Sequence, residues 1–285
     1  MYKFFRLFLI SFFIFCFEYS LGFSNEKKIK IGLLVPMTGE DKYLGQLIIK
    51  STKMALKDIN NNQIEIYPKD TRADPDTTFD MLDQDANISV EAVTLCMNEV
   101  RKGRNLSLTN VTIGWAADGY HFTHPLDYLG NDGGGGLASG TGTAIGAGLA
   151  LGDTDRTVVA VLGDGDTMQG ASSLWTAAHY SIPVLFVISN NRSNFNDEIH
   201  QETVARTRNR PVENRWIGQR IDDPTVSIER YAQSLGVESA GPIEKVADLV
   251  PALQHALSVV EAGKPYLLNV HVEKGYAVPP PAREA

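Results

Sequence analysis

The chain has 285 residues, of which 43% are hydrophobic and 21% charged, a composition ordinary for a globular protein with one large domain or two small ones. Its formal net charge of −8 argues against a nucleic-acid-binding surface, because phosphate binding needs a basic field and no run of lysines or arginines is present. Two cysteines, Cys16 and Cys96, are too few for a disulfide framework or a cysteine-based metal site.

The first 24 residues have the organisation of a secretory signal peptide. Lys3 and Arg6 give a basic start, residues 7–17 form an apolar run, and Gly22 and Ser24 are small residues suited to cleavage. The apolar run is too short to span a bilayer comfortably, so we expect no stable membrane span. The alternative is an uncleaved tail that associates with a membrane.

Residues 29–67 predict a strand, a helix and a second strand. An aliphatic run over 29–35 ends at Pro36, apolar residues recur at helical spacing over 44–59, and residues 64–67 alternate. This stretch resembles the start of the periplasmic binding proteins for branched-chain amino acids, whose first lobe opens in this way. The resemblance ends near Thr71, and two full lobes do not follow, so residues 28–71 are interpreted as a fragment of such a fold.

Residues 72–107 are polar and interrupted, and we expect them to form a junction or linker. One helix is predicted within them, over residues 90–101, with Cys96 as a small core residue. At the other end of the chain, residues 276–285 include three consecutive prolines and predict an extended, flexible tail.

Residues 108–275 predict an α/β domain with a parallel sheet flanked by helices. A glycine-rich block is followed by strands over 157–162, 184–189 and 266–272, which alternate with helices over 167–180, 227–235 and 246–260. The strand over 157–162 is an uninterrupted apolar run, which is typical of a strand buried on both faces of a parallel sheet.

Polar residues follow two of these strands directly. Gly163-Asp164-Gly165-Asp166 comes after the first strand and Asn190-Asn191 after the second, and parallel strands bring their carboxyl ends to one edge of a sheet. A carboxylate of Asp164 and a carboxamide of Asn191 are hard oxygen donors suited to Mg²⁺. Gly-Asp-Gly by itself is more often a simple turn, and no lysine follows as a P-loop requires, so the pairing with Asn-Asn carries the prediction.

The stretch GDGDTMQGASSLWTAAHYSIPVLFVISNN resembles the thiamine-diphosphate motif of the acetolactate synthase and benzoylformate decarboxylase family, which begins GDG and ends NN. The later elements follow the order of that family, and the resemblance covers residues 118–273. It implies a thiamine-diphosphate-binding fold with thiamine diphosphate and Mg²⁺ as cofactors.

The resemblance also implies roles for individual residues. The side chains of Asp164 and Asn191 and the main-chain carbonyl of Ser193 would ligate Mg²⁺. The residues of the motif that would lie against the diphosphate are Gly163, Gly165, Asp166 and Thr167.

The glycine-rich block matches the cofactor loop of the family. There the Gly135 carbonyl would accept a hydrogen bond from the pyrimidine amino group, next to Gly136, and Leu137 would wedge under the cofactor to bend it. His121 and His124 could contact a substrate, although a lone histidine is more often structural. The residues expected to form a polar lid over the site are Arg192, Asn194, Asn196 and Asp197.

In this family the chemistry also needs a glutamate on a separate pyrimidine-binding domain, usually on a neighbouring subunit. No such domain is recognised here, so no catalytic residue is assigned. We expect weak cofactor binding by the chain alone, and a homo- or hetero-oligomer with a chain that supplies that domain. The implied reaction is decarboxylation or carboligation of a small 2-oxo acid.

Two other interpretations remain open at this point. The chain could act as a fragment of a periplasmic branched-chain amino acid binding protein of an ABC transporter, or it could be a fusion or truncation without a selected function. The compartment is also open, because the signal predicts the periplasm, whereas enzymes of this family work in the cytoplasm.

Overall fold

The computed structural model describes residues 29–39, 41–59, 64–72, 74–131 and 136–274. The predicted signal peptide and the proline-rich tail therefore lie outside the described residues. The chain divides into two compact units between Ala73 and Asp74, and each unit is described by itself.

The first unit consists of β1 (Ile29–Val35), α2 (Lys42–Ile59) and β2 (Ile64–Asp70). The two strands are parallel, with Ile29 opposite Ile64, so the predicted strand, helix and strand are all present. The Asp70 carboxylate closes the turn after β1 by accepting hydrogen bonds from Met37 N and Thr38 Oγ1. Among the described residues of this unit, Val35 is the one buried hydrophobic side chain, and several larger ones are exposed.

The second unit is built on one sheet of five parallel strands. Its strands are β3 (Leu106–Thr109), β4 (Thr157–Gly163), β5 (Val184–Asn190), β6 (Glu238–Ile243) and β7 (Tyr266–His271), and their order in the sheet is β3-β4-β5-β7-β6. All neighbouring strands run parallel. This confirms the predicted fold class, an α/β domain with a parallel sheet flanked by helices.

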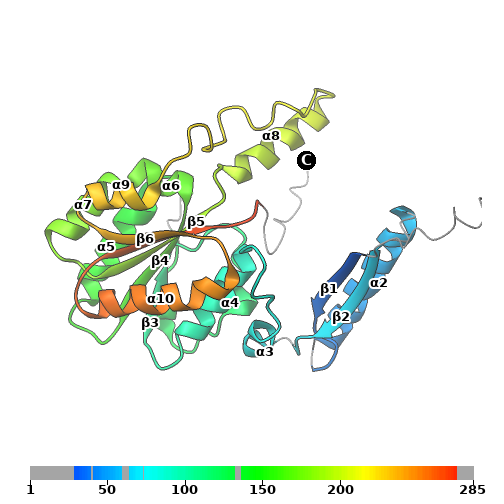
Figure 1. Ribbon diagram of the computed structural model, residues 1–285, viewed down its shortest axis with the longest axis horizontal. Helices are drawn as coiled ribbons and strands as arrows, with labels where there is room; N and C mark the ends of the chain where they lie inside the picture. Colours follow the sequence, from blue (N-terminus) through cyan, green and yellow to red (C-terminus); the bar gives the residue numbers. More distant parts are fainter. Residues whose placement is uncertain (1–28, 40, 60–63, 73, 132–135, 275–285) are drawn as a thin grey trace, which may run out of the picture. The chain divides into compact units, whose positions relative to one another are not determined.

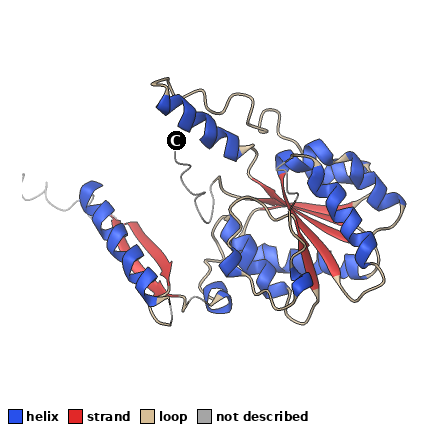
Figure 2. Ribbon diagram, turned by 180° about the vertical axis from the view of Figure 1, so that it is seen from behind, coloured by secondary structure: helices blue, strands red, loops and turns tan. Residues whose placement is uncertain are grey.

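Helices cover both faces of the sheet (Figures 1 and 2). One face carries α5 (Ser139–Leu151), α6 (Asp164–Gly170), α7 (Ser172–His179) and α9 (Ile228–Ser234), and the other carries α4 (Val90–Val100) and α10 (Val246–Glu261). Side chains alternate between the faces along each strand. Val159 and Val161 accordingly pack in the core with α4 and α10, whereas Val158 and Ala160 pack in the second core with α5 and α7.

The stretch 72–107, expected as a junction, contributes to the core of the second unit. It forms α3 (Pro75–Phe79), α4 and strand β3, and nearly every residue of α4 is buried, including Cys96 as predicted. The Ser89 hydroxyl caps the N-terminus of α4 by accepting from Ala92 N.

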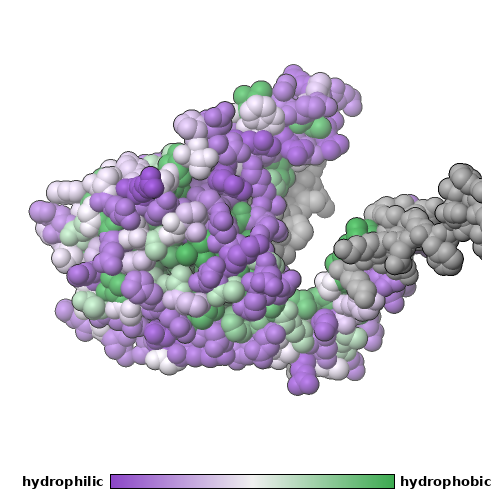
Figure 3. Space-filling view, viewed as in Figure 1, coloured by the Kyte–Doolittle hydropathy of each residue, from purple (hydrophilic) through white to green (hydrophobic). Residues whose placement is uncertain are grey.

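Helix α8 (Phe195–Thr207) follows β5 and extends away from the sheet in both views (Figures 1 and 2). The face visible in Figure 3 shows mainly hydrophilic residues over this projection. Two short 3-10 turns, η1 (Ala117–Gly119) and η2 (Pro125–Asp127), lie between β3 and α5. Within the described ranges, none of the helices combines the length and the apolar character that crossing a membrane requires.

Candidate cofactor site

The two predicted polar segments lie side by side at the carboxyl edge of the sheet. In the pairing of β4 with β5, Gly163 lies opposite Ser189, so the residues that follow each strand leave the sheet together. Helix α6 begins at Asp164 itself rather than near Thr167, which places Asp164 in the first turn of the helix. The sequence-based expectation that these two strand ends meet is therefore met in the structure.

The backbone N–H of Ser193 joins the two predicted metal-ligating side chains. It donates to Asp164 Oδ2 and to Asn191 Oδ1, at 2.9 Å in each case. A carboxylate oxygen and a carboxamide oxygen therefore both lie within hydrogen-bonding distance of a single N–H group. Ser193 is itself buried.

Asp164 is an unusually placed carboxyl group, with 3% of its surface exposed. Burial raises the pKa of Asp164 to about 6, although backbone N–H groups, including that of Ser193, lower it in part. A buried carboxylate costs free energy unless polar groups compensate it, and the hydrogen bonds from these backbone N–H groups supply part of that compensation.

The two consecutive asparagines have different environments. Asn190 is buried and its amide donates to Asn269 Oδ1 on β7 at 3.1 Å, while its own Oδ1 accepts from Arg192 N. Asn191 is only partly buried and lines the cavity described below. The first asparagine therefore stabilises the turn after β5, and the second is the one available to a ligand.

A cavity of about 470 Å³ opens at this edge of the sheet. Its walls come from the ends of β3, β4 and β5, the first turn of α6, the start of α5 and the first turn of α8; they include Asn110, Gly136, Leu137, Asp164, Asp166, Asn191, Ser193 and Asp197. A hollow of similar volume lies along α2, but its lining contains no carboxylate, and we assign it no role.

The cofactor loop predicted from the glycine-rich block meets α6 at one well-defined contact. Ala138 N donates to Asp166 Oδ1 at 2.6 Å, so Asp166 fixes the chain immediately after Leu137. Gly136 and Leu137 both line the cavity, and Leu137 is 50% exposed. Gly135, the predicted acceptor for the pyrimidine amino group, lies outside the described residues.

The other predicted residues of the motif occupy different positions. Gly163 and Gly165 line the cavity, and a side chain at Gly165 would overlap Asn194 Oδ1. Thr167 is buried, its hydroxyl donates to the carbonyl of Gly163, and it is not among the residues of the cavity wall.

Sequence reasoning did not identify the wall that follows β3. There Asn110 adopts a left-handed backbone conformation with φ of 49°, and it is 8% exposed. Its side-chain Oδ1 is buried and finds no hydrogen-bond partner within the described part of the chain. Asn110 directly follows the four-residue strand β3, which the sequence pattern does not predict. Without that strand, the sequence gives no reason to expect Asn110 at a third strand end beside Asp164.

A short extended segment runs along the outer edge of β3 toward the cofactor loop. Leu129 N donates to the carbonyl of Leu108, Asn110 N donates to the carbonyl of Gly130, and Val111 N donates to Asn131 Oδ1. These bonds bring Asn131 to the cavity, a few residues before Gly136.

The two histidines near this segment lie away from the cavity. His124 Nδ1 accepts from Leu126 N and caps η2, which is a structural role. His121 is exposed, with Nε2 3.8 Å from Asp74 Oδ1. The predicted lid residues Asn194, Asn196 and Asp197 do line the cavity, whereas Arg192 does not.

Comparison with known proteins agrees with this geometry. Residues 110–270 match the family model of the thiamine pyrophosphate enzymes, C-terminal TPP binding domain. The chain is 31% identical over 136 residues to a benzoylformate decarboxylase of Pseudomonas aeruginosa, covering 48% of this chain and 23% of that protein. It is 28% identical over 163 residues to a chloroplastic acetolactate synthase of Arabidopsis thaliana, covering 55% and 22%.

A solved structure gives the same result. The thiamine diphosphate-dependent 4-hydroxybenzoylformate decarboxylase of Rhodococcus jostii superposes with a TM-score of 0.55 and 25% identity, covering 68% of this chain and 34% of that one. The chain spans less than a quarter of the length of the curated relatives named above. Since the matching family model covers more than half of the sequence, the chain belongs to the thiamine pyrophosphate enzymes and contains their C-terminal cofactor-binding domain.

Proposed function

We propose that the cavity binds thiamine diphosphate together with Mg²⁺. The metal ligands are the Asp164 carboxylate, the Asn191 carboxamide oxygen and the main-chain carbonyl of Ser193. The observation that carries this proposal is the shared hydrogen bond, in which Asp164 Oδ2 and Asn191 Oδ1 both accept from Ser193 N. Two hard oxygen donors at neighbouring strand ends suit an octahedral Mg²⁺ completed by phosphate oxygens and water.

The residues of the cavity fit such a ligand. The first turn of α6 lines the cavity and can offer backbone N–H groups to an anion. The buried Oδ1 of Asn110, which has no hydrogen-bond partner among the described residues, can accept a hydrogen bond from a donor group of a ligand. A helix N-terminus is worth roughly half a positive charge, whereas Mg²⁺ carries two, so the metal dominates the binding of the diphosphate. The cavity residues assigned to the cofactor are Gly136, Leu137, Gly163, Gly165 and Asp166. Gly135, next to them in the chain, is assigned to it from the sequence alone, whereas the buried Thr167 holds the first turn of α6 through the carbonyl of Gly163.

The activity we propose is that of a 2-oxo acid decarboxylase or carboligase. When bound, thiamine diphosphate supplies a nucleophilic thiazolium carbon, and this chain contributes binding, orientation and electrostatics. A second chain, in a homo- or hetero-oligomer, supplies the pyrimidine-binding domain and its activating glutamate. Support for the reaction class comes from the similarity to a benzoylformate decarboxylase and an acetolactate synthase.

Isothermal titration with thiamine diphosphate and Mg²⁺ tests the proposal. We expect weak binding by the chain alone, stronger binding when a partner domain is added, and none by Asp164→Ala. Asp153→Ala, which changes an exposed aspartate two residues after the end of α5, is the matched control and should bind as the wild type does. Equal binding by Asp164→Ala and the wild type would refute the metal site.

The first unit supports a second, separate proposal. Its parallel strand, helix and strand are compatible with a fragment of a periplasmic binding protein that is fused to the cofactor domain. Titration with branched-chain amino acids tests this idea, because binding that survives Asp164→Ala would assign a transport role to the first unit.

Two further experiments address the fusion itself. Sequencing across the junction near Arg72 on independent DNA would test whether the fusion is genuine. Fractionation of cells would decide between periplasm and cytoplasm.

A further inference from the structure

Helix α8 has a single buried side chain, and that side chain is a carboxylate. Glu198 is 2% exposed, whereas every other residue of α8 is partly or fully exposed. A buried carboxylate costs several kcal/mol unless hydrogen bonds or opposite charges compensate it. The position of α8 against the domain therefore depends in part on the polar partners of Glu198, beside partly buried apolar residues such as Phe195 and Ile199.

Three segments converge on this carboxylate. Ser193 Oγ donates to Glu198 Oε1 at 2.5 Å, and the same oxygen lies 3.7 Å from Arg220 Nε and 4.0 Å from Lys274 Nζ. Both ion pairs are weak, because the distances are long and the Arg220 and Lys274 side chains are partly exposed. The Ser193 hydroxyl is the closest partner and the one that is itself buried.

Ser193 is also the residue that joins the two proposed metal-ligating side chains. Its N–H group binds Asp164 and Asn191, and its carbonyl is the third proposed ligand. The loop around it is held by further backbone bonds, from Asn194 N to the carbonyl of Gln219 and from Ile221 N to the carbonyl of Arg192. The Glu198 carboxylate therefore contacts, through the Ser193 hydroxyl, the residue whose N–H and carbonyl groups belong to the proposed metal site.

We infer that Glu198 is a positioning residue for the metal site, which orients Ser193 through its hydroxyl and thereby couples metal binding to the docking of α8. This inference rests on the proposed function. Removal of the carboxylate takes away the hydrogen bond of the Ser193 hydroxyl, so Ser193 is held less firmly by its backbone bonds alone and α8 loses its buried polar contact. Metal affinity therefore falls and α8 becomes more accessible. Loss of a group that orients a metal ligand typically costs 10- to 100-fold in metal affinity.

The experiment compares Glu198→Ala with Glu198→Gln in the full chain. The glutamine keeps an oxygen that accepts from Ser193 Oγ, so it tests the hydrogen bond separately from the charge. Glu202→Ala is the matched control, because Glu202 lies one turn further along α8 and pairs with Arg206 and Arg215 without contacting Ser193. The dissociation constant for Mn²⁺ is measured by electron paramagnetic resonance with thiamine diphosphate present, and circular dichroism verifies folding.

We expect Mn²⁺ to bind about tenfold or more weakly to Glu198→Ala, and with nearly wild-type affinity to Glu198→Gln and Glu202→Ala. Ser193→Ala should resemble Glu198→Ala, and the double variant should bind no more weakly than either single one. Cleavage by trypsin at Arg206 and Arg208 should slow when Mn²⁺ and thiamine diphosphate are added to the wild type, but not when they are added to Glu198→Ala.

Wild-type affinity of Glu198→Ala, or equal losses in Glu198→Ala and Glu202→Ala, would overturn the inference while leaving the proposed metal site intact. An equal loss in Glu198→Gln would overturn it as well, because charge would then matter and the hydrogen bond would not. Failure of the proposed function has a different signature, in which the wild type and Asp164→Ala bind Mn²⁺ equally.

Discussion

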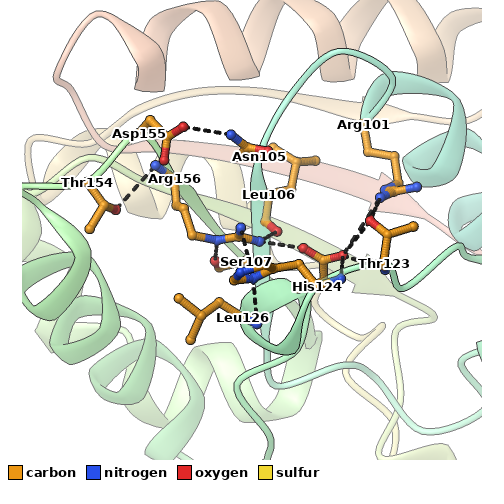
Figure 4. Close-up of polar contacts among 11 residues, drawn as sticks. Arg101, Asn105, Leu106, Ser107, Thr123, His124, Leu126, Thr154, Asp155 and Arg156 are labelled. Atoms are coloured by element: carbon orange, nitrogen blue, oxygen red, sulfur yellow. Dashed lines mark hydrogen bonds and ion pairs between the residues drawn. The ribbon is translucent and has the colours of Figure 1, made fainter.

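Arg156 and Asp127 form a buried ion pair that fastens the segment before the cofactor loop to the edge of the sheet. Arg156 Nη2 lies 2.5 Å from Asp127 Oδ1, and both side chains are 7% exposed. The Arg156 guanidinium also donates to Ser107 Oγ and to the carbonyl of Leu106 (Figure 4). Asp127 in turn accepts from the backbone N–H groups of Thr123 and His124, so this pair fixes where the segment along β3 begins.

Asp127→Asn should destabilise the protein by about 3–5 kcal/mol at pH 7, because it leaves Arg156 buried without an opposite charge. Burial raises the pKa of Asp127, but hydrogen bonds from Thr123, Arg156 and His124 outweigh it and hold the pKa at about 2, below the ordinary 3.8. The stabilisation from this depressed pKa is present above pH 4 and is lost as the pH falls toward 2.

Urea denaturation of the wild type and of Asp127→Asn across this pH range tests the prediction. The difference in unfolding free energy should narrow below pH 4, and a difference that stays constant down to pH 2.5 would contradict it. Asp155→Asn removes an exposed aspartate that accepts from Asn105, and this control should change stability by less than about 1 kcal/mol.

Two glycines on α5 should respond oppositely to alanine. A Cβ at Gly140 would overlap the Asp166 carboxylate and lie 2.6 Å from Leu162 Cδ2, so Gly140→Ala should lower stability by about 1–3 kcal/mol and disturb the contact of Asp166 with Ala138. A Cβ at Gly142 meets open space, so Gly142→Ala should raise stability by about 0.5–1 kcal/mol through helix propensity alone. Thermal denaturation measures both, and equal effects of the two substitutions would be inconsistent with the packing described.

Leu137→Ala should weaken cofactor binding with little effect on stability. The side chain is half exposed, so its loss should change the unfolding free energy by no more than about 0.5 kcal/mol. If the cofactor covers it, the lost apolar contact is worth about 1.5 kcal/mol, or about tenfold in affinity. Leu149→Ala, which removes a 66% exposed leucine of the helix α5 that follows Leu137, is the control for calorimetric titration and should bind as the wild type does.

Asp164→Asn should stabilise the metal-free protein at neutral pH and abolish metal binding. Because burial raises the pKa of Asp164 to about 6, the folded protein keeps a proton that the unfolded chain loses near 3.8. The wild type therefore loses stability as the pH rises from about 4 to about 6, by up to about 3 kcal/mol, and the neutral asparagine does not. Denaturation in the presence of a chelator should show that Asp164→Asn has a higher unfolding free energy than the wild type at pH 7.5 and an equal one at pH 4. The control Asp153→Asn should match the wild type at both pH values.

The strands with uninterrupted apolar runs could be predicted from the sequence, because both of their faces are buried. This holds for β4 and β5, whose carboxyl ends form the edge at which Asp164 and Asn191 lie. Strand β7 was also predicted, although Asn269 interrupts its apolar run. Strand β3 was not predicted, because it has only four residues. Strand β6 contains Gly241-Pro242 and a register shift at the edge of the sheet, which hides the alternation that identifies strands.

Helix α8 was not predicted as a helix for a different reason. Its polar residues give it no apolar stripe, and its one buried side chain is a carboxylate, so hydrophobic periodicity carries no signal. The wall around Asn110 was missed together with β3, because a residue at a strand end is recognised only when the strand is. The position of Glu198 next to Ser193 depends on tertiary structure, and no local pattern indicates it.

The first unit has a practical consequence for work with this protein. Two parallel strands and one helix leave Ile29 55% and Met54 59% exposed. Bare strand edges with aliphatic side chains readily pair with other chains, so self-association in concentrated solution should begin here.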